Sequence, residues 1–148
     1  MGVTDDNTIY VLDWYRDRID FPTQVKMVEN LAKKWDPLLI GIESNASQQA
    51  LPQQLKDSTM LPINEVNRTK DKVTRISAGF IHFENGKVFL PENHHELENF
   101  VNEYVYFPQG KHDDMLDSME LALQLVKEPY WDLDPYLIVG GNLIHYYG

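Results

Sequence analysis

A group of acidic side chains opens the stretch KHDDMLDSMELALQLV, residues 111–126. Asp113, Asp114 and Asp117 fall within about one helical turn of each other, and His112 directly precedes them. Like charges three or four residues apart on a helix repel by roughly 0.2–0.5 kcal/mol per pair. Carboxylates in a first helical turn gain roughly 0.3–1 kcal/mol from the helix macrodipole, which could offset this repulsion without any function. The alternative is that a divalent cation binds here, because Mg²⁺ and Mn²⁺ prefer oxygen ligands.

A further candidate acid ends an apolar stretch. The sequence LLIGIES, residues 38–44, follows a helical pattern and an Asp-Pro turn, and it predicts a buried parallel strand that ends at Glu43. Ligands of open α/β sheets bind at the carboxyl ends of the strands, so Glu43 is a candidate for the same cation. The alternative is that Glu43 has simply reached solvent.

The densest group of basic side chains lies in NRTKDKVTR, residues 67–75. Arg68, Lys70, Lys72 and Arg75 are candidates for contact with a nucleic-acid backbone, because phosphates attract Lys and Arg. The alternative is a solvated face of a loop or helix. The formal net charge of −10 argues against a broad nucleic-acid surface. It does not exclude nucleic acid, because metal ions held by acids can bridge them to phosphate.

Other chemistries find less support in the sequence. His94 and His95 are adjacent but lack a spaced third metal ligand, so we expect them at the surface. The chain has no phosphate-binding loop of the ATPase type and no serine or zinc peptidase motif. It also has no cysteine, which excludes disulfides and thiolate metal sites.

The length and composition are those of one globular domain. The 148 residues can bury a hydrophobic core, and 43% of them are apolar. No apolar run approaches the roughly 20 residues of a membrane span, and the first residues lack the pattern of a signal peptide. An intracellular protein that does not contact membranes is the simplest expectation.

The position of Glu43 depends on the elements expected in the first half of the chain. A turn at residues 4–7 precedes a strand-like segment, so we expect this segment to be the second arm of a hairpin whose first arm lies before Met1. A strand, a helix and a parallel strand then form a βαβ unit, followed by another helix and another strand. These expected elements are residues 7–19, 20–35, 36–44, 45–57 and 61–67.

The positions of Asp113, Asp114 and Asp117 depend on the elements expected in the second half of the chain. Apolar residues at helical spacing predict three helices, at residues 70–83, 94–107 and 111–126, and a Gly turn with a short strand at residues 84–91. Residues 127–148 have aromatic, Pro and Gly character without a clear period, so we expect a loop or a C-terminal docking tail.

Three segments now stand in a recognisable order: IYVLDWYRDRI, LLIGIESNASQQAL and GKHDDMLDSMELAL, with KDKVTRI between the last two. Together they resemble the C-terminal nuclease domain of the large terminase subunit of tailed bacteriophages. That family has a ribonuclease H-like α/β fold, a mixed sheet flanked by helices, and is related to the Holliday-junction resolvases. The resemblance extends to about residue 126 and implies that residues 1–148 form one terminase nuclease-like domain.

The resemblance implies an endonuclease that cuts concatemeric viral DNA during packaging, in the host cytoplasm. It implies a site for two Mg²⁺ or Mn²⁺ ions, held by Glu43, Asp114 and Asp117, with Asp113 and His112 as further catalytic candidates. The spacing used by the resolvase relatives favours Asp114 and Asp117 over Asp113. The implied partners are double-stranded DNA, the portal protein and the small terminase subunit.

One departure from the family pattern concerns the first metal ligand, an aspartate on the first strand. Asp5 and Asp6 lie in the expected turn and Asp13 lies on the following strand, so none of them matches. We therefore expect a domain that is incomplete at its N-terminus and lacks its first strand. Two alternatives stay open: a non-catalytic prophage remnant or interaction module, and a resolvase-like nuclease.

Overall fold

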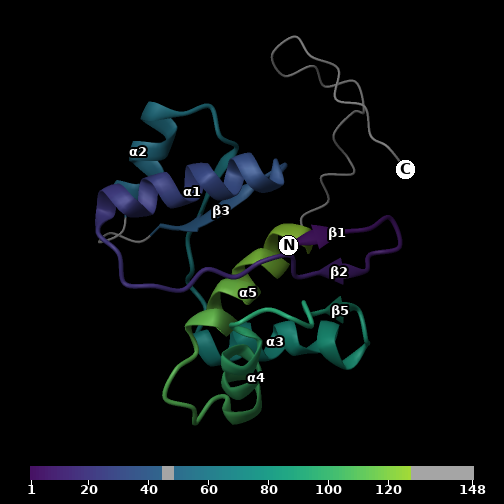
Figure 1. The fold of residues 1–148 in the computed structure, drawn as a ribbon. Helices are drawn as coiled ribbons and strands as arrows, with labels where there is room; N and C mark the ends of the chain where they lie inside the picture. The colour runs from purple at the N-terminus through teal and green to yellow at the C-terminus, as the bar shows by residue number, and fades with distance from the viewer. Residues whose placement is uncertain (45–48, 128–148) are drawn as a thin grey trace.

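The structure is a computed structural model and describes residues 1–44 and 49–127. This part of the chain forms five short strands and five helices, whose arrangement is drawn in Figure 1. No helix of the described part is long and apolar enough to cross a membrane. In chain order the elements are β1 (Gly2–Val3), β2 (Ile9–Tyr10), α1 (Phe21–Trp35), β3 (Ile40–Glu43), α2 (Ala50–Ser58), β4 (Ile63–Val66), α3 (Lys72–Glu84), β5 (Val88–Phe89), α4 (Leu97–Tyr106) and α5 (Asp114–Lys127).

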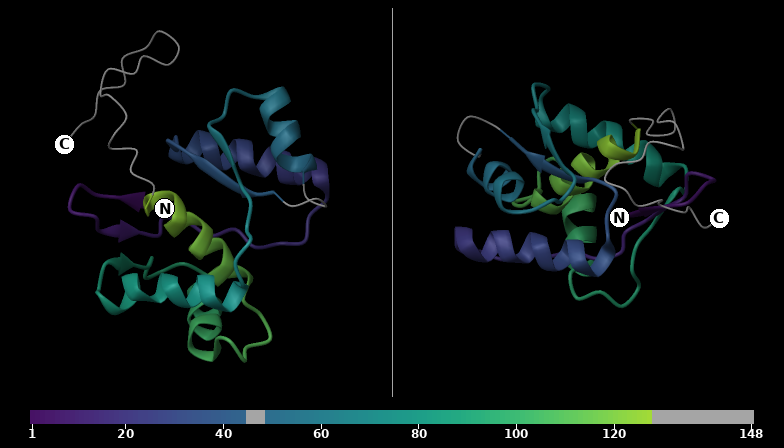
Figure 2. Two further views of the ribbon diagram at one scale, coloured as in Figure 1. Left: turned by 180° about the vertical axis from the view of Figure 1, so that it is seen from behind. Right: turned by 90° about the horizontal axis from the view of Figure 1, so that it is seen from above.

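The strands form two small sheets. β1 pairs antiparallel with β2, and β2 pairs parallel with β5. In the other sheet β3 pairs parallel with β4, with Glu43 opposite Val66 at the carboxyl end. Helix α5 passes between the two sheets and packs against β3, α3 and α4 (Figure 1, Figure 2). The predicted α/β class, with mixed sheets flanked by helices, is confirmed.

Two predictions about the N-terminal hairpin are wrong. Its first arm was expected before Met1, but Gly2–Val3 already pairs with Ile9–Tyr10. The strand expected over residues 7–19 is also shorter, because regular pairing with β5 covers only Ile9–Tyr10, and the last ladder bond is from the Val11 N–H to the Phe89 carbonyl. The β-branched and aromatic residues that follow leave the sheet, since tertiary context overrides strand propensity.

The α1 helix begins and ends as its sequence predicts. The Asp20 carboxylate accepts a hydrogen bond from the Thr23 N–H, and Pro22 lies in the first turn, where a missing N–H costs nothing. Asp36 ends the helix in the left-handed region, with a φ of 43°. In α2, Pro52 also lies in the first turn and interrupts nothing.

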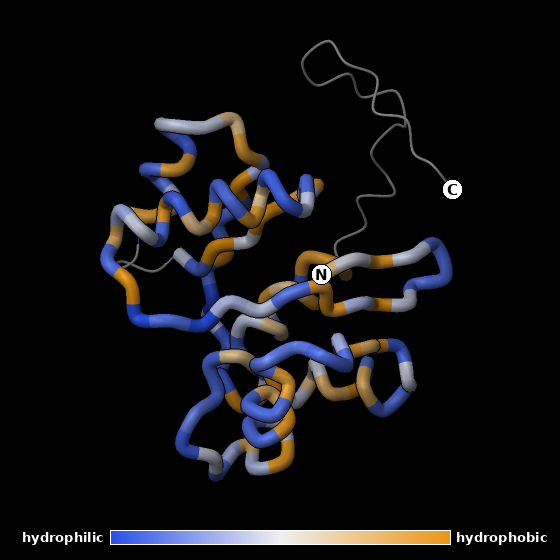
Figure 3. Tube along the Cα trace, viewed as in Figure 1, coloured by the Kyte–Doolittle hydropathy of each residue, from blue (hydrophilic) through white to orange (hydrophobic). Residues whose placement is uncertain are grey.

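The core lies between α5 and its neighbours. Leu116, Met119 and Leu123, from the predicted apolar stripe of α5, are all buried, and each contributes roughly 1.5–3 kcal/mol by leaving water. They pack in one cluster with residues of β2, α3 and α4, and Figure 3 shows hydrophobic residues recurring along these elements. This packing fixes the acidic first turn of α5 in space. The other buried members of the cluster are Ile9, Val11, Ile76, Phe100 and Met115.

The β3 strand is less buried than its apolar sequence predicts. All four of its residues are half-buried, because β4 is its only partner among the described strands and covers one edge. It lies close to α5 at Gly41, where a Cβ atom would be 2.5 Å from Cδ1 of Leu125. A glycine here lets α5 run close to β3, and this brings Glu43 within reach of the acidic turn.

Candidate functional site

The backbone at the start of α5 is capped by a carboxylate from another helix. Oε2 of Glu103, in α4, accepts hydrogen bonds from the N–H groups of Met115 at 2.8 Å and Leu116 at 3.3 Å. The Glu103 side chain is 4% exposed, and its other oxygen lies 3.5 Å from the Arg16 guanidinium. Two free N–H groups of the first turn are therefore satisfied by Glu103, so that the aspartates of α5 are not needed to cap them.

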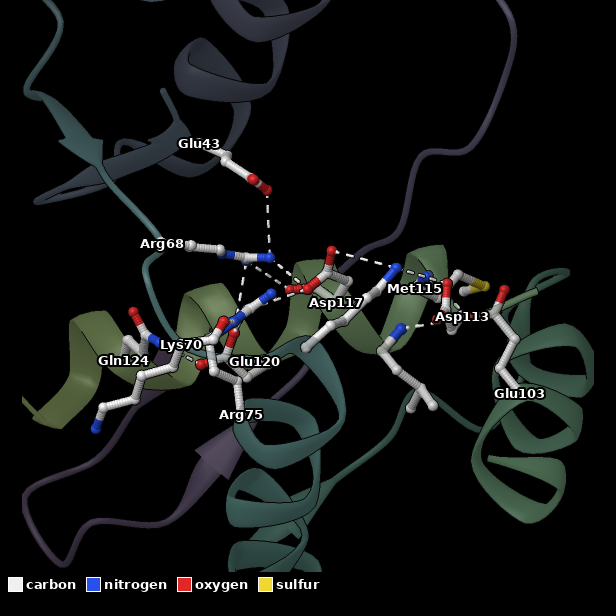
Figure 4. A network of polar contacts seen from close by, with 12 residues as sticks. Glu43, Arg68, Lys70, Arg75, Glu103, Asp113, Met115, Asp117, Glu120 and Gln124 are labelled. Carbon is white, nitrogen blue, oxygen red and sulfur yellow. Dashed lines mark hydrogen bonds and ion pairs between the residues drawn. The ribbon is translucent and has the colours of Figure 1, made fainter. Parts of the chain in front are cut away.

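Asp117 lies at the centre of an ion-pair network (Figure 4). One nitrogen of the Arg68 guanidinium contacts the Asp117 carboxylate and also lies 3.3 Å from the Glu43 carboxylate. The Arg75 guanidinium approaches the same Asp117 oxygen at 3.2 Å. The structure thus brings Glu43, at the end of β3, and Asp117, in the first turn of α5, to the same cationic group.

Glu120 belongs to this network although the sequence reasoning missed it. Its side chain is buried, lies 2.5 Å from the Arg75 guanidinium and 3.6 Å from that of Arg68, and accepts a hydrogen bond from Gln124. The available signal was its position three residues after Asp117, which places both carboxylates on one helix face. The apolar stripe of α5 obscured it.

Lys72 joins Asp113 to the network. Its ammonium group lies 2.7 Å from the Asp113 carboxylate and 3.6 Å from that of Asp117. Burial alone would lower the pKa of Lys72, but the hydrogen bond to Asp113 and the charge of Asp117 outweigh it, so that the pKa is raised. Lys72 therefore acts as a permanent positive charge between these two acids.

Asp114 and His112 lie outside the network. The Asp114 side chain is 73% exposed and lies 4.0 Å from the Arg16 guanidinium, at the distance limit of an ion pair. His112 is exposed. The sequence spacing favoured Asp114 with Asp117, whereas the structure brings Asp113 together with Asp117. Projected at about 100° per residue, Asp113, Asp117 and Glu120 fall within about 60° around the helix axis, whereas Asp114 lies about 100° from Asp113 and about 120° from Glu120, beyond the edge of that face.

The basic segment has different partners from those expected. Arg68, Lys72 and Arg75 were candidates for contact with DNA, but all three pair with the acids of the network, and the two arginine side chains are buried. Lys70 is exposed, and Figure 4 shows its side chain extending away from the carboxylates. A hollow of about 450 Å³ lies beside the network, between residues 67–70, α3 and α5, and Lys70 lines it.

The two adjacent histidines differ, and the prediction that both lie at the surface is wrong for one of them. The Nε2 atom of His94 lies 3.0 Å from the Asp13 carboxylate, and the ring packs edge-on against Trp14. His95 remains exposed. Within the described residues, neither histidine belongs to a group of three or more acid or histidine side chains that could hold a metal ion.

The carboxylate oxygens of the network are the kind of ligand that a hard cation prefers. In the structure, however, these carboxylates pair with the side chains of Arg68, Lys72 and Arg75. Mg²⁺ needs oxygen atoms at about 2.0–2.1 Å. Among the described residues no three acid or histidine side chains approach one another closely enough for that. The Arg68 guanidinium stands between Glu43 and Asp117 and contacts both carboxylates.

A known family of protein domains matches nearly all of the described part of the chain. The family model described as the terminase RNase H-like domain matches residues 1–125, which include the hairpin, Glu43 and almost all of α5. No curated protein and no solved structure matches the chain. The predicted resemblance is confirmed by the family match, and the chain belongs to the terminase RNase H-like domain family.

Proposed function

We propose that this chain is the nuclease domain of a phage DNA-packaging terminase, which cuts concatemeric viral DNA with the help of Mg²⁺ or Mn²⁺. The family match supports a terminase nuclease domain in general. The observation that carries the finer proposal is the convergence of Glu43 and Asp117, from a strand end and a helix start, on one cationic group. Acids that meet from separate elements are what a metal-dependent phosphodiesterase requires.

The roles follow from position. Glu43, Asp117 and Asp113 would supply carboxylate oxygens to the metal, which activates water and stabilises the leaving oxygen when it is bound. Asp114, which is exposed at the rim, could join them only by a side-chain rearrangement. His112 remains a candidate for orienting an acid or assisting proton transfer at the approach to the site.

DNA must approach a chain whose formal net charge is −10. Lys70 is the basic residue of segment 67–75 that is exposed and directed away from the acids, and it lines the hollow beside them. We assign Lys70 to the DNA backbone, and Arg68, Lys72 and Arg75 to the acids. Further partners proposed from the family are the portal protein and the small terminase subunit.

The test is cleavage of a supercoiled plasmid with Mn²⁺, using this chain and also the protein read from the gene with any residues encoded before Met1. Glu43→Gln and Asp117→Asn should each reduce cleavage by at least about a hundredfold, because each removes a metal ligand. Glu98→Gln, at an exposed position on α4, is the matched control and should cleave like the parent. Cleavage that survives both site substitutions would place the active site elsewhere.

A non-catalytic interaction module is the second candidate. The observation that favours it is the pairing of each network acid with Arg or Lys, an arrangement that is stable without metal. Folded protein that neither binds Mn²⁺ nor cleaves DNA in either form would support this reading. The family match favours a terminase domain over the resolvase alternative.

A further inference from the structure

We propose that Arg68 is a built-in counter-ion that competes with divalent cations for the acidic site, so that a metal ion binds only when the Arg68 guanidinium moves away. The inference deepens the proposed function, because it rests on the assignment of Glu43 and Asp117 as metal ligands. It gives Arg68 a regulatory role that its basic charge alone does not indicate.

The contacts of Arg68 reach both elements of the site. Its guanidinium pairs with Glu43 at the end of β3 and with Asp117 and Glu120 on α5. It also donates a hydrogen bond of 2.8 Å to the main-chain carbonyl of Asp117. The side chain is 5% exposed. It is therefore a buried group placed between the two elements, and not a surface charge that happens to lie nearby.

The charges of the network are nearly balanced without metal. Arg68, Lys72 and Arg75 supply three positive charges, against four carboxylates from β3 and from the start of α5. A divalent cation added to this arrangement would meet three resident cations at short range and would be repelled. Removal of one positive charge at the centre restores the excess of negative charge that attracts a metal. The four carboxylates belong to Glu43, Asp113, Asp117 and Glu120.

Arg68 is the member of the network best placed to leave. It lies in residues 67–71, between β4 and α3, outside any helix or strand, whereas Lys72 and Arg75 belong to α3. Its Nε atom is buried without a hydrogen-bond partner in the described residues, so part of its donor capacity is unused. The adjoining hollow of about 450 Å³ could receive the displaced side chain.

The test is a Mn²⁺ titration of the full chain, followed by the electron paramagnetic resonance signal of free Mn²⁺. Arg68→Gln should bind Mn²⁺ at least about tenfold more tightly than the parent. Lys26→Gln is the control for the loss of one positive charge, because Lys26 is exposed on α1 and has no role in the site; its affinity should stay within about twofold of the parent. The double variant Arg68→Gln/Asp117→Asn should lose the gain.

A second measurement uses the parent chain alone and so does not depend on how a variant folds. In a ¹⁵N NMR titration with Mg²⁺, the Arg68 Nε–Hε signal should shift and exchange faster with water as the guanidinium leaves. An Arg68 signal unchanged at Mg²⁺ saturation would overturn the proposal. So would equal Mn²⁺ affinities for Arg68→Gln and the parent, including the case in which neither binds.

The two proposals fail separately. If Arg68→Gln tightens Mn²⁺ binding but no form of the protein cleaves DNA, the counter-ion role stands and the nuclease proposal falls. If cleavage depends on Glu43 and Asp117 while Arg68→Gln leaves Mn²⁺ affinity unchanged, the nuclease proposal stands and the counter-ion role falls.

Discussion

At the scale of single residues, the acids and bases singled out by the sequence act on each other. Asp117 contacts Arg68, Arg75 and Lys72, and through Arg68 it is linked to Glu43. The repulsion among the aspartates of α5 is therefore relieved by resident cations in the structure described. The two proposals predict that Mg²⁺ or Mn²⁺ replaces part of that compensation.

The first prediction is that Asp117 and Asp114 contribute unequally to the free energy of unfolding. Asp117→Asn should lower the free energy of unfolding by about 2–3 kcal/mol, because removing one partner of a buried ion pair costs about 3–5 kcal/mol and Asp117 keeps 21% of its side chain exposed. Asp114→Asn should change it by less than about 0.5 kcal/mol, since that side chain is largely in water. Urea unfolding monitored by circular dichroism gives both values, and equal effects would contradict the network.

The second prediction is a pH dependence at Asp13. The hydrogen bond from Lys34 is the main cause that lowers the pKa of Asp13 from 3.8 to about 2, and His94 adds to it. A carboxyl whose pKa is lower in the folded state stabilises the fold above its unfolded pKa, and this contribution disappears as the pH falls through the folded pKa. The thermal midpoint of the parent should exceed that of Asp13→Asn near neutral pH, and the difference should shrink between about pH 4 and pH 2.

The control for this pH series is Asp5→Asn, an exposed aspartate in the hairpin turn. Its difference from the parent should stay small at every pH. A difference for Asp13→Asn that persists unchanged at pH 2 would show that the ion pair with Lys34 does not contribute to stability.

At the scale of elements, α5 positions the site because its two ends are held differently. Apolar side chains of its middle turns pack into the core, and Gly41 of β3 admits Leu125 near its last turn. At the first turn the Glu103 carboxylate binds two backbone N–H groups. The position of the acidic turn thus depends on α4 as well as on the sequence of α5.

The third prediction tests this cap between helices. Glu103→Ala should lower the free energy of unfolding by about 1–2 kcal/mol, because it leaves two buried donors of α5 without their acceptor. Glu98→Ala, at an exposed position on the same helix, should change it by less than about 0.5 kcal/mol. Hydrogen exchange at Met115 and Leu116 should accelerate in the first variant alone; unchanged protection there would show that another group caps the helix.

At the scale of the whole molecule, two small sheets are bridged by one helix. β1, β2 and β5 form one sheet, and β3 and β4 form the other, with α5 between them (Figure 1, Figure 2). The acidic site lies where the carboxyl end of β3 meets the start of α5. The tail expected over residues 127–148 lies, apart from its first residue, outside the described residues.

The fourth prediction concerns the activity of this chain by itself. Cleavage of plasmid DNA should be weak, because no hairpin aspartate completes the ligand set: Asp6 bonds Thr4 and Thr8, and Asp13 pairs with Lys34. The protein read from the gene with any residues encoded before Met1 should cleave more strongly with Mn²⁺ if those residues bring an aspartate to Glu43, and Glu43→Ala should abolish that cleavage. Strong cleavage by this chain alone, retained in Glu43→Ala, would show that a different site is active.

The order and type of the elements follow largely from local pattern. Apolar spacing, the Asp20 cap and the glycine turn at Gly86 act over a few residues, so that the five helices and most strands could be predicted from sequence. The convergence of Glu43 with the first turn of α5 was predicted in outline, since the carboxyl end of a strand and the start of a helix are natural ligand sites. Family membership also followed from the sequence and is confirmed.

The tertiary structure decided which charges meet. Asp113 and Asp114 are neighbours in sequence, but helix rotation sends one to Lys72 and the other toward solvent. Arg68 follows a strand in an irregular segment, and only packing places its guanidinium between β3 and α5. The ion pairs of the network join side chains that are 25 to 52 positions apart in the sequence, so no local pattern encodes them. Their partners are set by the fold.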